Sequence, residues 1–515
     1  MNRRDFLGTG LGTLVAATSA GNNAMAPNRA NAETRTRHAA SKKGVISPRN
    51  VKLNLKPVMT NIIHTGLWEG PCRWSPVEVG LEKARAEERF ARWSKQIREG
   101  RFVGGENVNI MEPAHLTFSE DFVLGREQAD KLKPDSHEAD AYFIYPAGSS
   151  IAAYEIGKRC SRPILLKGLG CRNVDIVAYS RAKGVEAFAT ADDAEFKTLL
   201  SLLLARKVFA GTSVLFPTDR GLPASCSVGS IWDLQGLRER LGIEVKKVSY
   251  KELAEQMELT IGNKLLAGEA EQAADALIGK ADKSYLERKY VVRSFQFYQT
   301  VQSLMKRHGS NAFTIECFEL CASKLADKWK ITPCLIHTLH RDLGYASSCE
   351  GDLGSLLAMR LLMSVSNKSC HQGNSDPRGQ GTFRINHSVP GLKMNGYDQA
   401  DLPYQLGRFV KSGWGTKAVV DFMNNTEKTV TVARVNPLAT KLLVCKGQLV
   451  GASGWGKDNL GCSVEALIRP PDGRADEFLK KRLEYGNHLQ WVYGDYTDQL
   501  RQLGPMVGLE VEVIS

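Results

Sequence analysis

Short apolar segments alternate with longer amphipathic segments through the first half of the chain. Between residues 58 and 205 the apolar segments predict strands, and residues 78–100 predict a charged amphipathic helix. The predicted strands lie at 58–63, 107–111, 141–145, 163–166 and 185–188. Strands that alternate with helices are typical of an open α/β sheet. Residues 58–205 are therefore predicted to form an N-terminal α/β domain.

The same alternation returns in residues 206–345, which we predict to be a second α/β domain. Its predicted elements are strands at 208–216, 243–248 and 313–318 and helices at 232–241 and 269–307. Residues 346–515 begin with a segment that predicts a buried helix at 353–359. They continue with short strands and tight turns at 429–435, 441–445 and 448–451. The predicted fold class is α/β: two open Rossmann-like α/β domains followed by a mostly antiparallel, β-barrel-like C-terminal domain.

Basic residues are concentrated at the N-terminus. Residues 1–57 carry +8 of the formal net charge of +12, which leaves +4 for the rest of the chain. The nearly balanced body of the protein gives no indication of a nucleic-acid partner. Eleven cysteines, an odd number, do not indicate a disulfide framework in a chain of this length.

The first 32 residues resemble an export signal. Asn2–Leu7 contains Arg3 and Arg4 in a twin-arginine pattern, and residues 8–20 form a weakly apolar segment. That segment is too short for a stable membrane anchor. We predict cleavage after Ala32, a basic linker at 33–57, and a protein that the twin-arginine machinery exports to the periplasm or another extracytoplasmic compartment.

Two acidic residues lie in unusually apolar surroundings. Glu316 is inside the predicted strand 313–318, and Asp352 directly precedes the predicted buried helix. A buried carboxylate is costly unless a cation or hydrogen-bond donors meet it, so both acids are candidates to share one divalent ion. Two structural alternatives remain open: Asp352 as a helix N-cap and Glu316 as a solvent-facing residue of an edge strand.

These acids belong to a longer pattern. Glu316 lies in the sequence IECF, Pro333-Cys334 follows, and Cys349–Asp352 precedes the apolar helix. His488 lies in YGNH, followed by VYGD. This pattern resembles the L-fucose isomerase and L-arabinose isomerase superfamily.

The resemblance implies a metal-dependent aldose–ketose isomerase. Its implied metal ligands are Glu316, Asp352 and His488, which would hold Mn²⁺ or another divalent cation. Glu316 and Asp352 would also be catalytic and transfer the proton between C1 and C2 of a monosaccharide through an enediol. His387, in a segment where the family usually has His followed by Cys, is a candidate substrate-binding residue. This chain departs from the family in having Ser388.

The resemblance also implies a homo-oligomer, either a trimer or a hexamer. The main alternative function is a non-catalytic periplasmic sugar-binding or regulatory protein on the same fold. An exported oxidoreductase is disfavoured because the chain has no dinucleotide fingerprint and no iron–sulfur cysteine spacing.

Cysteines and histidines supply two further candidate sites. Four cysteines lie between residues 317 and 349, but only Cys317 and Cys321 form a closely spaced pair, so small buried apolar side chains are favoured over a zinc site. His337 and His340 have the spacing of a helical chelating pair, and a partly exposed helix face is the favoured interpretation.

Overall fold

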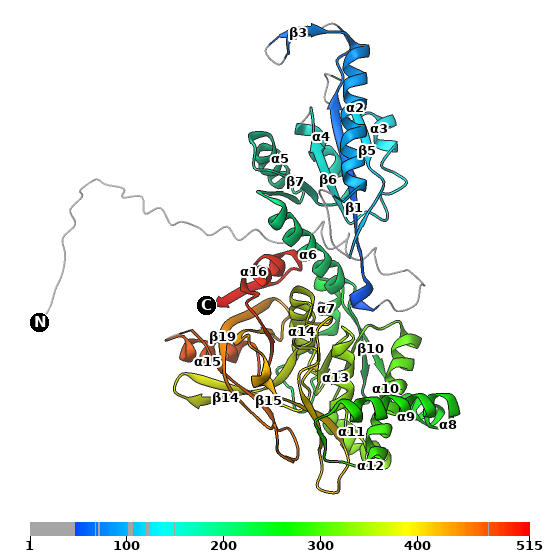
Figure 1. Ribbon diagram of the computed structural model, residues 1–515, viewed down its shortest axis with the longest axis vertical. Coiled ribbons are helices and arrows are strands. Elements are labelled where there is room, and N and C mark those ends of the chain that lie inside the picture. The colour runs from blue at the N-terminus through cyan, green and yellow to red at the C-terminus, as the bar shows by residue number, and fades with distance from the viewer. Residues whose placement is uncertain are drawn as a thin grey trace, which may run out of the picture.

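The N-terminal part of the computed structural model is built on a parallel sheet with helices around it (Figure 1). The structure describes residues 47–66, 68–70, 73–100, 107–119, 124–148, 150–471 and 473–515. The strands of this sheet are β1 (Leu53–Ile62), β4 (Val108–Ile110), β5 (Ala114–Phe118), β6 (Ala141–Pro146), β7 (Ile164–Lys167) and β8 (Ala187–Thr190). Their order is β4-β1-β6-β7-β8, with β5 also paired to β1. The accompanying helices are α2 (Val79–Arg98), α3 (Arg126–Asp130), α4 (Ser150–Cys160), α5 (Cys171–Ala182) and α6 (Asp193–Ala210).

The first strand begins five residues earlier than the predicted residue 58, so residues 53–57 belong to the sheet and not to a linker. Leu53 and Leu55 are buried there, which explains why the strand extends into the basic segment. The predicted export signal and most of the predicted linker lie outside the described residues. Among the residues that the structure describes, no helix is long and apolar enough to cross a membrane.

A second parallel sheet has the strand order β10-β9-β12-β13. Its strands are β9 (Ser213–Pro217), β10 (Glu244–Val248), β12 (Ala312–Ile315) and β13 (Ala346–Cys349). The helices around it are α7 (Leu234–Leu241), α8 (Tyr250–Gly262), α9 (Lys264–Lys280), α10 (Arg288–His308), α11 (Cys317–Ala322), α12 (Leu325–Trp329) and α13 (Cys334–Asp342). The chain adds β10 on one side of β9 and then returns to place β12 on the other side. The strand order therefore reverses between β9 and β12.

Three predictions in this region are corrected by the structure. Residues 208–210 end helix α6, because Phe209 continues its buried face, and the strand starts only at Ser213. The strand predicted at 313–318 ends at Ile315, and Cys317 begins α11. His337 and His340 are fully buried on α13, so the partly exposed helix face is wrong.

The C-terminal region contains a closed, six-stranded antiparallel β-barrel, which confirms the predicted barrel-like character. Its strands are β14 (His371–Gly379), β15 (Thr382–His387), β18 (Thr429–Val435), β19 (Lys441–Ser453), β20 (Val464–Arg469) and β21 (His488–Tyr493). The order is β18-β21-β14-β15-β20-β19, and pairing of β18 with β19 closes the barrel. The two strands predicted at 441–451 are one continuous strand, β19, with a register shift between Leu449 and Gly451.

The remaining strands and α-helices of the described chain are smaller. They are β2 (Trp68–Gly70), β3 (Arg73–Val77), β11 (Lys283–Ser284), β16 (Tyr404–Arg408), β17 (Thr416–Val420), α15 (Ala475–Lys481), α16 (Thr497–Met506) and β22 (Glu510–Ile514). Strand β22 extends the barrel sheet by pairing in parallel with β19.

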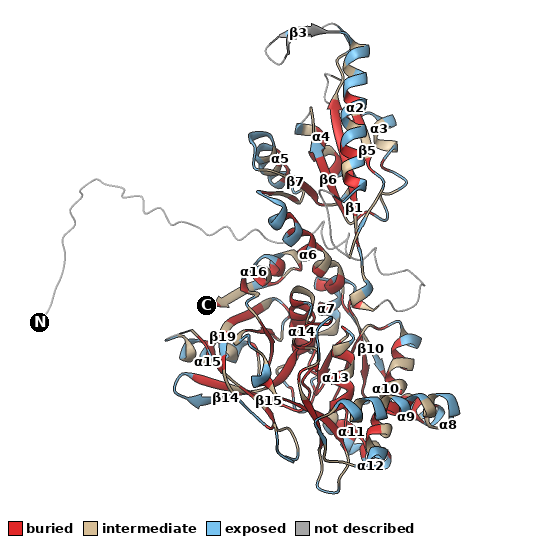
Figure 2. Cartoon of the chain, viewed as in Figure 1, coloured by how far each residue is buried: buried red, intermediate tan, exposed pale blue. Residues whose placement is uncertain are grey.

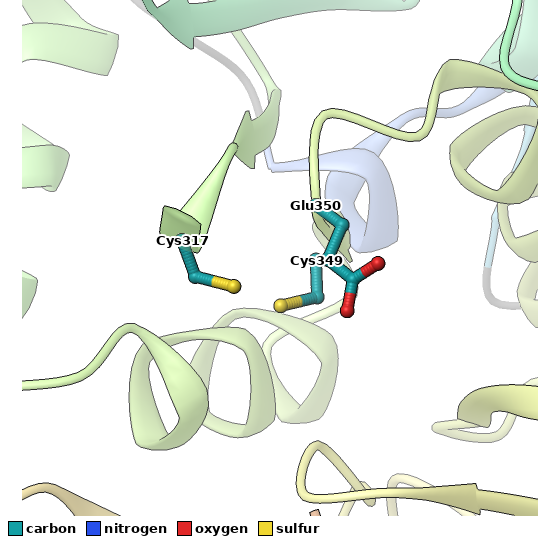
Figure 3. A group of neighbouring side chains, drawn as sticks. All are labelled: Cys317, Cys349 and Glu350. Carbon is teal, nitrogen blue, oxygen red and sulfur yellow. The ribbon is translucent and has the colours of Figure 1, made fainter. Parts of the chain in front are cut away.

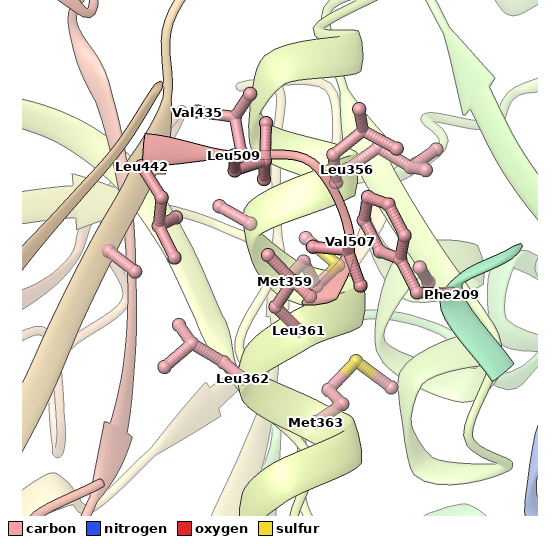
Figure 4. Close-up of a cluster of buried hydrophobic side chains, with 14 of the residues drawn as sticks. Phe209, Leu356, Met359, Leu361, Leu362, Met363, Val435, Leu442, Val507 and Leu509 are labelled. Carbon is pink, nitrogen blue, oxygen red and sulfur yellow. The ribbon is translucent and has the colours of Figure 1, made fainter. Parts of the chain in front are cut away.

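Helix α14 (Leu353–Ser366) joins the second sheet to the barrel. It packs against β13 on one side, β18 and β21 on another, and α6. Its apolar side chains are buried on every face, as the predicted buried helix requires (Figures 2 and 4). Burying each Leu of this kind contributes about 1.5–3 kcal/mol, so the helix fixes the sheet and the barrel against each other.

Candidate metal centre

Two carboxylates follow neighbouring strands at one edge of the second sheet. Strands β12 and β13 are parallel, and Ile315 pairs with Cys349 at their carboxyl ends. Glu316 and Glu350 are the next residues along each strand, so both leave the sheet at the same edge. This edge borders the reversal of strand order between β9 and β12, and such reversals are where open α/β sheets bind ligands.

Two histidines approach the same place from the barrel. His387 is the last residue of β15 and His488 is the first residue of β21. Strand β14 lies between β15 and β21, and its Asn374 pairs with both Asn386 and His488. The antiparallel register therefore brings both histidines to one end of the barrel, with their ring centroids 5.4 Å apart.

Glu350, His387 and His488 together form a buried group whose ligand atoms all lie within 4.8 Å of one another. His387 Nε2 lies 3.2 Å from Glu350 Oε1, and His488 Nε2 lies 3.4 Å from Glu350 Oε2. The three residues are only 8%, 1% and 2% exposed, respectively. One carboxylate and two imidazoles, buried and converging, are a donor set that can hold a divalent cation.

The charges of the group support one another. Burial alone would lower the pKa of His387, but Cys462 and Glu350 outweigh it and raise this pKa to about 10. Burial alone would raise the pKa of Glu350, yet His387 and His488 hold it below its usual value. Glu350 is therefore an ionised carboxylate, the form that binds a cation, and a cation bound at this group would displace the proton that these contacts favour on His387.

The backbone at Glu350 is in an unusual conformation. Its φ of 62° lies in the left-handed region, and Gly351 follows with a φ of 66°. A non-glycine residue held in this region costs about 1–3 kcal/mol and persists where the surrounding structure requires it. Here the turn aims the Glu350 carboxylate at the two histidines, so the strain is located at the candidate site.

Asp352 lies behind the group and supports His488. Its Oδ1 accepts a hydrogen bond from the Ser355 amide at 3.0 Å and caps α14. Its Oδ2 lies 2.7 Å from Arg434 Nη1 and 2.9 Å from His488 Nδ1. Although burial opposes ionisation, Arg434 and His488 hold the pKa of Asp352 well below its usual range. Because Asp352 occupies Nδ1 of His488, the Nε2 atom of that ring is the one that faces Glu350.

Arg434 connects the separate segments around this carboxylate. It donates to Ser355 Oγ, to the Tyr485 carbonyl and to the Gly229 carbonyl as well as to Asp352. A side chain at Gly486, where φ is 109°, would come within 2.9 Å of the Arg434 guanidinium. Gly486 therefore leaves the space in which Arg434 lies.

Glu316 is fully buried and only half satisfied. Its Oε1 accepts a hydrogen bond from the Ser225 amide at 2.9 Å. Its Oε2 has no hydrogen-bond partner among the described residues. Burial and the charges of Glu350, Cys317 and Glu316 raise the pKa of the Cys226 thiol to about 11. Because Ile315 pairs with Cys349, the next residues along the two strands, Glu316 and Glu350, are neighbours, and Glu316 Oε2 is without a hydrogen-bond partner among the described residues.

The segment 218–230, which follows β9, closes over both acids. Glu319, one turn beyond Glu316, accepts the amides of Asp219 and Arg220 at 2.8 Å each and fixes the start of this segment. Further along, Ser227 Oγ lies 3.3 Å from both Glu350 Oε2 and His488 Nδ1. The segment therefore supplies hydrogen bonds to the site and shields it from water.

Buried atoms without hydrogen-bond partners also indicate a cation site, in addition to the types of ligand that the group offers. His488 Nε2 and Glu316 Oε2 are both buried, and neither has a hydrogen-bond partner in the part of the chain that the structure describes. Leaving buried polar atoms unpaired is costly, so native structures rarely do it without a reason. A cation bound by the Glu350 group would remove that cost at His488 Nε2.

The structure brings together some of the residues predicted from sequence and not others. His488 and His387 are in the group, and Glu316 lies beside it. Asp352 is outside it, because both of its oxygens are bonded to the helix and to Arg434 and His488. Glu350 is the acid that sequence analysis missed. The only local signal was its place in Cys349-Glu350-Gly351-Asp352, directly before the predicted buried helix.

This arrangement predicts a graded effect of replacing Asp352. Asn at this position keeps the helix cap but removes the charge behind His488. Loss of such a supporting partner lowers metal affinity about 10–100-fold without abolishing binding. Isothermal titration of Asp352→Asn with Mn²⁺ measures this effect. A complete loss of binding in a folded variant would instead favour Asp352 as a direct ligand.

Comparison with known proteins gives no assignment for the chain. The sequence matches no protein-family model, and no curated protein matches it. The function proposed below therefore depends on the geometry of the site together with the resemblance in the sequence.

Proposed function

We propose that this chain is a metal-dependent aldose–ketose isomerase whose divalent cation is held by Glu350, His387 and His488. One observation carries the proposal: a buried group of cation ligands lies beside a second buried carboxylate, Glu316, with a free oxygen. Aldose–ketose isomerisation needs these two components, a site that polarises neighbouring oxygens and a base that moves a proton.

The proposed ion is Mn²⁺. Glu350 supplies an ionised carboxylate oxygen, and His387 and His488 supply imidazole nitrogens. Carboxylates suit Mn²⁺, while imidazoles are also ligands of zinc, iron and nickel. When bound, the cation would act as a Lewis acid on O1 and O2 of the sugar, the oxygens carried by the two carbons that exchange oxidation state.

Glu316 is the proposed acid–base residue. The Ser225 amide fixes one of its oxygens and leaves the other free to accept a proton from C2 of the aldose and return it to C1. Removal of the C2 proton gives an enediol; return of a proton from the same carboxylate to C1, with movement of the O2 hydroxyl proton to O1, gives the ketose. Positioned acid–base catalysis of this kind contributes about 10²–10⁴-fold to the rate.

Asp352 and Arg434 are the proposed positioning residues. Asp352 holds Nδ1 of His488, which directs the opposite ring nitrogen to the ion. Arg434 in turn holds Asp352 and the Gly229 carbonyl of the segment that covers the site. Both residues would act on the reaction through His488 and through that segment.

The variant Glu316→Gln tests the catalytic role. It keeps the volume and the hydrogen bond from Ser225 but removes the base, so we expect metal content to be retained and isomerisation to fall about 10²–10⁴-fold. The measurement is NMR of a panel of aldoses in D₂O with Mn²⁺-loaded protein, which follows ketose formation and deuterium incorporation at C1 of the ketose and at C2 of the remaining aldose. Glu258→Gln, which changes an exposed carboxylate paired with Lys328, is the control.

Two results would contradict the proposal. Wild-type, Mn²⁺-loaded protein that converts no aldose and exchanges no C2 proton would contradict the isomerase function. Glu316→Gln with wild-type exchange would contradict the assignment of the base.

A further inference from the structure

Two cysteines lie close to Glu350, the carboxylate that also contacts the two histidines. Cys317 begins α11 directly after Glu316, and Cys349 is the last residue of β13. Their sulfur atoms and a Glu350 oxygen all lie within 4.8 Å of one another. Figure 3 shows the two sulfurs pointing toward each other beside the Glu350 carboxylate.

The position of this pair follows from the parallel strands. Ile315 pairs with Cys349, so the chain beyond Ile315 passes next to Cys349 as it enters α11. Cys349 is 1% exposed, and Cys317 is partly buried. A third thiol, Cys334, is buried in the same small cluster with Cys349 and Val389. The thiols are therefore gathered around the end of β13, although they are scattered in the sequence.

Two thiols and a carboxylate form a different donor set from that of the histidine group. Thiolates are soft ligands that select zinc and similar cations over Mn²⁺. Three protein ligands with a fourth, open position are a common arrangement for tetrahedral zinc. The sequence spacing favoured buried apolar cysteines over a zinc site, because Cys317 and Cys349 become neighbours only through strand pairing.

We propose that Cys317, Cys349 and Glu350 form a second cation site, selective for thiophilic divalent ions such as Zn²⁺. Binding replaces two S–H bonds by two sulfur–metal bonds and releases two protons to solvent. Because Glu350 belongs to both groups, an ion at the thiols draws its carboxylate away from the histidines. Zinc at this site is therefore an antagonist of the cation at the histidine group. The proposal of this site is independent of the proposed isomerase function.

Cobalt is the probe that distinguishes the two groups. Titration of reduced, Mn²⁺-loaded protein with Co²⁺ should produce a thiolate-to-cobalt charge-transfer band in the near ultraviolet, and Zn²⁺ should abolish it. Cobalt held only by imidazole and carboxylate gives no such band. We expect the band to disappear in Cys317→Ser and in Cys349→Ser. It should persist in Cys171→Ser, which changes an exposed cysteine on α5, and in His488→Gln.

Several outcomes would overturn the proposal. These are absence of the band in protein whose thiols are all free, a band that survives Cys317→Ser, and a disulfide between Cys317 and Cys349 in protein isolated without reductant. Circular dichroism confirms that each variant is folded. If Cys349→Ser unfolds, Cys317→Ser is the decisive variant. It should stay folded because Cys317 is only partly buried. Loss of the band with normal Mn²⁺-dependent isomerisation would remove this site and leave the proposed function intact.

Discussion

Replacing Glu350 by glutamine is expected to remove the bound cation while the protein stays folded. Glutamine keeps the volume of the side chain but removes the carboxylate that contacts both His387 and His488. The loss in Mn²⁺ affinity should exceed the loss of about 10–100-fold that is typical when a residue hydrogen-bonded to a metal ligand is removed. It should therefore exceed the loss in Asp352→Asn, and isomerisation should be lost with the ion.

Metal content by mass spectrometry and a titration with Mn²⁺ measure this effect. Glu252→Gln is a matched control, because Glu252 also pairs with a histidine, His308, at 2.7 Å, but outside the candidate site. Glu252→Gln should bind Mn²⁺ as the wild type does. A Glu350→Gln protein with unchanged metal content would contradict the assignment of Glu350 as a ligand.

The second large effect concerns the buried ion pair between Asp352 and Arg434. Each side chain is about as buried as any in the protein, with exposures of 2% and 1%. Removing one partner leaves the other charge buried and unpaired, which costs about 3–5 kcal/mol. We therefore expect the free energy of unfolding to fall by this amount in Arg434→Met and in Asp352→Asn.

The double variant Asp352→Asn/Arg434→Met distinguishes loss of this ion pair from other destabilising effects of the two substitutions. Neither charge remains in it, so its loss of stability should be no larger than that of the more damaging single variant. Denaturant unfolding of the metal-free proteins gives all the values needed for the cycle. Losses that simply add would show that Arg434 stabilises the fold through its bonds to Tyr485 and Gly229 and not through Asp352.

Much of the fold could be predicted from the sequence because it depends on local patterns. The apolar residues of α14 predict a helix buried on all sides, and the structure has one. Alternation of strands and helices predicted mixed α/β architecture, and the short strands near the C-terminus predicted the barrel. Boundaries were less predictable: Val208 and Phe209 favour a strand locally, but they complete the buried face of α6.

The choice between Glu350 and Asp352 could not be made from sequence. Both acids follow β13 and both reach His488, but the left-handed backbone at Glu350 and Gly351 places the Glu350 carboxylate between the two histidines, while Asp352 contacts Nδ1 of His488. No local pattern in the sequence indicated that Arg434 is the partner of Asp352. Arg434 comes from β18, far along the chain, and reaches Asp352 only because α14 packs against that strand.

The cysteine pair illustrates the same limit. Spacing along the chain separates Cys317 from Cys349, while the register of β12 against β13 makes them neighbours. Such contacts depend on which strands pair, and no local pattern in the sequence specifies that.

Glu350, His387 and His488 are the proposed ligands of a divalent cation. A crystal of Mn²⁺-loaded protein, with anomalous diffraction collected at the manganese edge, would locate that cation. We expect a strong anomalous peak within coordination distance of one Glu350 oxygen and of Nε2 of both histidines. A fully loaded crystal with no peak between these three side chains, or with its peak bonded directly to Asp352, would contradict this assignment.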